Sequence, residues 1–111
     1  MNATLLAALL AVESGGNDLA IGDNGRARGA LQIHAGVVQD VNRHHGTRYT
    51  HRDMHDRAKA VRVCELYLAT YAPGASPEVQ ARVWNGGPRG ASKPATMGYW
   101  ARVKRQMGGA R

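Results

Sequence analysis

A chain of 111 residues with one cysteine, Cys64, suits a single compact domain over residues 1–111, and it excludes a disulfide within the chain. No stretch approaches the roughly 20 consecutive apolar residues of a membrane-spanning helix, so no membrane span is expected. The net charge of +7 favours an anionic polymer as partner, but the 12 arginines are spread along the chain without a nucleic-acid-binding motif, so no nucleic acid is expected.

The first predicted element is an apolar helix over residues 3–14. Asn2 can cap its start, and Gly15 and Gly16 can end it by adopting the left-handed conformation. Leu9 and Glu13 share the apolar face of this helix, because positions four apart stack along it. The segment has no basic residue ahead of it, so we expect synthesis in the cytoplasm without a signal peptide.

Residues 19–32 predict a small β-hairpin. Its strands, residues 19–22 and 26–32, flank Asp23-Asn24-Gly25, a sequence that favours a tight turn. Four further helices are predicted from apolar periodicity and from glycine, proline and serine residues that begin or end helices. They lie over residues 34–46, 54–72, 77–84 and 95–107. The sequence therefore predicts an α+β, mostly helical fold with about five helices and one hairpin.

Glu13 is the strongest candidate for acid–base chemistry. The negative end of its helix and its leucine neighbours disfavour the carboxylate, so we expect a raised pKa, as a general acid for glycoside cleavage needs. An acid that merely reaches solvent as the helix ends explains the position equally well. Asp18 or Asp23 could face Glu13 as a second carboxylate, or serve only as turn residues.

The remaining reactive residue types give weaker signals. His51 and His55 have the spacing of a zinc-binding helix, but no third ligand accompanies them, so neither a metal nor another cofactor is expected. Cys64 lies on the apolar stripe of the helix predicted over residues 54–72 and is expected in the core.

Four segments, ESGGN, AIGDNGRARGALQI, RVWNGGPRG and YWARV, follow one another between about Val12 and Val103. In order and spacing they resemble the motifs of the lytic transglycosylase family, which includes goose-type lysozymes. The resemblance implies a lysozyme-like fold, with the hairpin beside an active-site cleft. It also implies a peptidoglycan-degrading glycosidase, a muramidase that cleaves the MurNAc–GlcNAc β-1,4 bond with Glu13 as general acid/base. Whether the product is a 1,6-anhydro sugar or a hydrolysed end stays open.

The resemblance also implies a set of substrate-binding residues. Gly29 and Gln32 match a G-x-x-Q strand that lines the sugar cleft. Trp84 replaces the tyrosine that usually precedes the family's asparagine, and Asp23 lies near the position of a usual serine. The expected substrate-binding residues are Ser14, Asp23, Gly29, Gln32, Trp84, Asn85 and Tyr99.

The expected partner is the glycan strand of peptidoglycan, bound by a monomer at the bacterial cell wall. Without a signal peptide, the enzyme would act as a phage endolysin. A phage holin or carriage in a virion would then deliver it to the cell wall. Two alternatives stay open: a non-catalytic module that binds cell-wall glycan, and a glycosidase that cleaves chitin or chitosan. A basic nucleic-acid-binding protein is a rival of another class, and it predicts binding that weakens steeply with salt.

Overall fold

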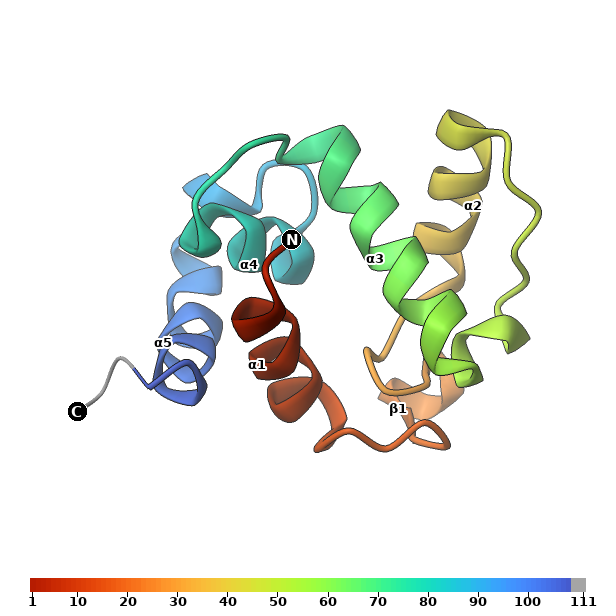
Figure 1. The fold of residues 1–111 in the computed structure, drawn as a ribbon, viewed down its shortest axis with the longest axis horizontal. Helices are drawn as coiled ribbons and strands as arrows, with labels where there is room; N and C mark the ends of the chain where they lie inside the picture. The colour runs from red at the N-terminus through yellow and green to blue at the C-terminus, as the bar shows by residue number, and fades with distance from the viewer. Residues whose placement is uncertain (109–111) are drawn as a thin grey trace. The chain divides into compact units, whose positions relative to one another are not determined.

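A computed structural model describes residues 1–108 (Figure 1). These residues form two compact units. One unit contains residues 13–67, and the other contains residues 1–12 and 68–108. The elements are α1 (Ala3–Ser14), β1 (Ile21–Gly22), η1 (Asp23–Gly25), β2 (Ala27–Arg28), α2 (Ala35–His45), η2 (Arg52–His55), α3 (Arg57–Tyr71), α4 (Pro77–Gly86), η3 (Gly90–Ser92), η4 (Pro94–Thr96) and α5 (Met97–Gln106), where η marks a 3₁₀ helix.

The expected fold class is confirmed at the coarse level. Residues 1–108 contain five α-helices and one two-stranded antiparallel sheet, which is a mostly helical α+β composition. The lysozyme-like arrangement and the single domain over residues 1–111 stay predictions. None of the helices in the described part of the chain is long and apolar enough to cross a membrane.

The hairpin of the 13–67 unit is shorter than predicted. Ile21 pairs with Arg28 and Gly22 with Ala27, and η1 joins the two strands. The second strand ends at Arg28 because Gly29 has a φ of 81° and Gln32 a φ of 52°, which turns the chain back on itself. Residues 29–32 therefore form a tight loop, closed by two hydrogen bonds of 3.1 and 3.0 Å between the backbones of Arg28 and Ile33.

Two helices complete the core of this unit. α2 ends at His45, close to the predicted end, and is followed by Gly46, whose φ of 66° is left-handed. The helix predicted from residue 54 begins instead at Arg57, because Asp56 has an extended backbone that separates η2 from α3. Cys64 is fully buried, as expected. The buried apolar residues of the unit are Ala27, Ala30, Leu31, Ile33, Val38, Val41, Met54, Ala60, Val63, Cys64 and Tyr67.

In the other unit, polar caps begin the helices. The Leu5 N–H donates to Asn2 Oδ1 at 2.6 Å at the start of α1, and the Val79 N–H donates to Ser76 Oγ at 3.3 Å at the start of α4. The buried Thr96 hydroxyl accepts from Arg82 Nε at 2.8 Å and donates to the Gly90 carbonyl at 2.7 Å. These bonds link α4 to the segment that leads into α5.

Candidate functional site

A polar network in the 13–67 unit surrounds the loop that follows α1, residues 15–20. Gly15 and Gly16, with φ values of 68° and 81°, end the helix as predicted. Ser14 Oγ donates to the Ala30 carbonyl at 2.7 Å and accepts from the Asn17 N–H at 3.0 Å. One hydroxyl therefore ties the end of α1 both to the 15–20 loop and to the segment after β2.

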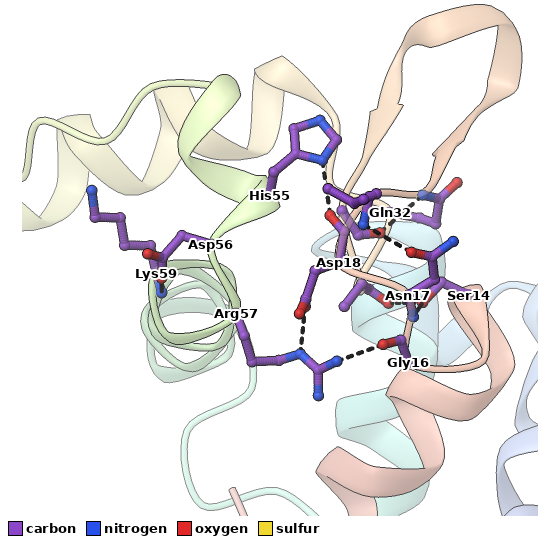
Figure 2. A network of polar contacts seen from close by, with 12 residues as sticks. Ser14, Gly16, Asn17, Asp18, Gln32, His55, Asp56, Arg57 and Lys59 are labelled. Carbon is purple, nitrogen blue, oxygen red and sulfur yellow. Dashed lines mark hydrogen bonds and ion pairs between the residues drawn. The ribbon is translucent and has the colours of Figure 1, made fainter.

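Residues around the start of α3 hold the same loop from another side. Arg57 Nε donates to Asp18 Oδ1 at 2.6 Å, and Arg57 Nη2 donates to the Gly16 carbonyl at 2.5 Å (Figure 2). His55 Nδ1 donates to the Asp18 carbonyl at 2.9 Å, which requires the Nδ1–H tautomer or the protonated ring. Three hydrogen bonds from two neighbouring residues thus fix the course of the loop.

The hairpin packs closely around Gly29 and Gln32. Gln32 Nε2 donates to the Gly29 carbonyl at 3.0 Å, and a Cβ on Gly22 would lie 2.3 Å from Gln32 Oε1. A Cβ on Gly29 would lie 1.8 Å from the Met54 carbonyl oxygen. Close packing against backbone therefore requires glycine at position 29, whereas a side chain at position 22 would displace only the end of the Gln32 side chain.

The 15–20 loop and β1 carry two exposed apolar side chains. Leu19 is 77% and Ile21 is 59% exposed, although both are large and hydrophobic. The Leu19 N–H donates to Asn17 Oδ1 at 2.9 Å, and this hydrogen bond holds the backbone of Leu19 in place. The segment thus presents two large apolar side chains to solvent on a backbone that hydrogen bonds hold in place.

Sequence reasoning missed Leu19, Ile21 and Arg57 as site residues. A signal existed for the first two, because apolar residues two apart in the strand predicted over residues 19–22 would lie on one face. The structure places Leu19 in a turn and begins the strand at Ile21. For Arg57 no signal existed, because its partner Asp18 lies 39 positions away.

Five of the predicted site residues belong to the 13–67 unit. Glu13 is half-buried in the last turn of α1, and Asp23 is exposed with its Oδ2 3.3 Å from His34 Nε2. Ser14, Gly29 and Gln32 all make contacts with backbone groups near the hairpin, as described above. Of the two carboxylates proposed to assist Glu13, Asp18 pairs with Arg57 and Asp23 with His34.

The other three predicted site residues belong to the second unit. Trp84 is half-buried and Asn85 is exposed, both in α4. Tyr99 is 4% exposed, and the guanidinium carbon of Arg102 lies 5.7 Å from the centre of its ring. The roles assigned to all eight residues stay predictions.

The two histidines weighed as metal ligands bind backbone carbonyls instead. His51 Nε2 donates to the Ile33 carbonyl at 2.7 Å, and His55 contacts Asp18 as described. Within residues 1–108, no group of three or more His, Cys, Asp or Glu side chains is placed to hold a metal ion.

Comparison with known proteins gives one informative likeness. No protein-family model matches the chain, and no curated protein sequence matches it significantly. Among solved structures, it resembles a chain from the crystal structure of Aeromonas hydrophila PliI, a lysozyme inhibitor, in complex with Meretrix lusoria lysozyme. The identity is 29% and the TM-score 0.81, over 95% of this chain and 89% of that chain. The likeness is thus to one chain of an inhibitor–lysozyme complex.

This likeness to an inhibitor complex contradicts the enzymatic expectation. It points to inhibition or binding, so membership of the lytic transglycosylase family, muramidase activity and the role of a phage endolysin in cell lysis are corrected. The expected glycan-strand and phage partners have no support, and the solved complex is one of two proteins. The motif glycines have structural roles that do not depend on catalysis, because Gly15 and Gly16 end α1 and Gly29 packs against Met54.

Proposed function

We propose that the chain acts by binding a protein partner, that this partner is a lysozyme, and that binding inhibits it. The observation that carries the proposal is the likeness to a chain of the PliI–lysozyme complex over 95% of this protein. A protein of this kind works by covering part of its partner, so it needs a preformed contact surface.

The 15–20 loop and β1 offer such a surface. Covering Leu19 and Ile21 would contribute about 1.5–3 kcal/mol for each side chain that becomes fully buried. The hydrogen bonds from Arg57 and Ser14 order this backbone in advance, which reduces the entropy that binding would otherwise cost. We therefore propose the exposed Leu19–Ile21 pair as the apolar centre of the contact.

Three finer features belong to the proposal. The helices and hairpin adopt a lysozyme-like arrangement without its catalysis, which an experimental structure would test. The chain meets its partner at the bacterial cell wall, where a lysozyme finds its substrate; fractionation of producing cells tests this location. A monomer binds one lysozyme, which the mass of the complex tests.

The decisive experiment titrates the chain into Meretrix lusoria lysozyme in a calorimeter and follows clearing of bacterial wall suspensions in parallel. We expect a one-to-one complex and a loss of clearing that tracks its formation. The chain alone is the control, and it should leave the walls intact. Absence of a complex at micromolar concentrations would overturn the proposal. Clearing by the chain alone that disappears in Glu13→Gln would overturn it in favour of catalysis.

A further inference from the structure

The net charge of the protein resides in its last 33 residues. Residues 1–78 contain eight Arg and Lys and eight Asp and Glu, so they are neutral overall. Residues 79–111 contain seven Arg and Lys but neither Asp nor Glu. The arginines are spread along the whole chain, as noted above, whereas all the acidic residues lie within residues 1–78.

Ion pairing follows the same division. In residues 1–78, carboxylates lie close to basic side chains, as in Asp18–Arg57, Asp53–Lys59 and Glu65–Arg62. Arg82 pairs with Glu78 at 3.0 Å. Beyond Arg82, the part of the chain that the structure describes contains five basic residues, none of which forms an ion pair there: Arg89, Lys93, Arg102, Lys104 and Arg105. These five residues, all exposed, are called the basic set below.

The basic set stands on an ordered framework. Lys104 and Arg105 lie on the solvent side of α5, because Tyr99 and Val103 occupy its buried side. Lys93 precedes η4, and its Nζ donates to the Gly86 carbonyl at 2.6 Å. The set is thus divided between α5 and the segment that joins α4 to it.

We propose that the basic set binds a flexible phosphodiester polymer. Guanidinium groups donate two hydrogen bonds at once to a phosphate, and three of the five residues are arginines. A flexible polymer can follow charges that stand on two separate segments, whereas a flat anionic membrane attracts basic residues that lie near its surface and binds more firmly when apolar side chains insert. In the described part of this region, Met97 is the one exposed large hydrophobic side chain. This inference does not rest on the proposed function.

Two sources share this chemistry: polyol phosphates of bacterial walls and single-stranded nucleic acids. The test therefore uses three probes, namely poly(glycerol phosphate), a thymidine oligonucleotide and vesicles of phosphatidylglycerol. We expect both polymers to bind, with an affinity that weakens as salt rises. Tighter binding of one polymer identifies the source. Binding to vesicles without binding to either polymer would overturn the proposal.

Two triple variants separate the basic set from net charge. R89Q/K104Q/R105Q removes three members of the set, while R26Q/R48Q/R52Q removes three exposed arginines from the neutral part of the chain. We expect the first to weaken polymer binding about tenfold and to lower the slope of log affinity against log salt by about 2. The second should stay within about twofold of the wild type. Equal losses in both variants would contradict the proposal.

Two further measurements complete the design. Thermal unfolding by circular dichroism checks that both variants fold. Lysozyme binding should be unchanged in R89Q/K104Q/R105Q, so a failure of this inference is distinguishable from a failure of the proposed function.

Discussion

At the scale of single residues, position 29 accepts only glycine, for two separate reasons. Its φ of 81° is left-handed, and a Cβ would meet the carbonyl of Met54 at 1.8 Å. Gly29→Ala should lower the free energy of unfolding by about 3 kcal/mol or more, measured by urea denaturation. Gly36→Ala is the matched control, because it lies in α2 with no atom within 4 Å of the added Cβ. It should be neutral or stabilising by up to about 1 kcal/mol; similar losses at both sites would contradict the argument.

Leu19 and Ile21 should affect binding but not folding. Both side chains are mostly exposed, so L19S/I21S removes little buried surface, and the free energy of unfolding should change by less than about 1 kcal/mol. Binding to lysozyme should weaken at least about tenfold, since the apolar centre of the contact is lost. Calorimetry measures the affinity. Met97→Ser removes another exposed hydrophobic residue, 60% exposed and in the second unit, and should leave the affinity unchanged. An equal loss there would argue against a localised contact.

At the scale of elements, Arg57 should control the order of the 15–20 loop. Lysine keeps the charge but lacks the forked donors that reach Asp18 and Gly16 together. We expect Arg57→Lys to speed hydrogen exchange of the loop amides at least about threefold, because local opening costs less once these bonds are lost. Arg62→Lys is the control on the same helix, since its 3.6 Å pair with Glu65 is exposed and contributes little. Unchanged exchange in Arg57→Lys would show that the other contacts suffice.

How far the sequence predicts an element depends on how local its causes are. The starts of α1 and α4 follow from Asn2 and Ser76, whose caps act within three residues, and these starts are confirmed. The start of α3 was wrong by three residues, because apolar periodicity does not reveal the extended Asp56. The hairpin was predicted too long, since the positive φ of Gln32 depends on packing rather than on its residue type.

The candidate site was less predictable than the elements. Ser14 and Gln32 were singled out for sugar binding, and the structure shows them bound to nearby backbone groups. Arg57 was missed, because its contacts join residues about 40 positions apart. The family resemblance rested on short motifs of glycines and polar residues. Such motifs specify turns and close approaches, which proteins of different function can share.

At the scale of the whole molecule, the buried Cys64 couples stability to alkaline pH. Burial, with a smaller contribution from the Glu65 carboxylate, raises the pKa of the Cys64 thiol far above its usual range. In the unfolded chain the thiol ionises with a pKa near about 8.5. Because the pKa is raised on folding, the stability is fully present below that pH and is lost as the pH rises above it, by up to about 1.4 kcal/mol per pH unit.

A comparison with Cys64→Val isolates this contribution, because valine keeps an apolar side chain at the site but has no proton to lose. Lysines and tyrosines titrate in the same range, but they do so equally in both proteins. The free energy of unfolding of the wild type, measured relative to that of the variant, should therefore fall by about 2 kcal/mol between pH 8 and pH 10. Urea denaturation at several pH values measures this difference. Parallel curves for the two proteins would mean that the thiol reaches solvent in the folded state, and its reaction with a thiol reagent under native conditions would then be fast.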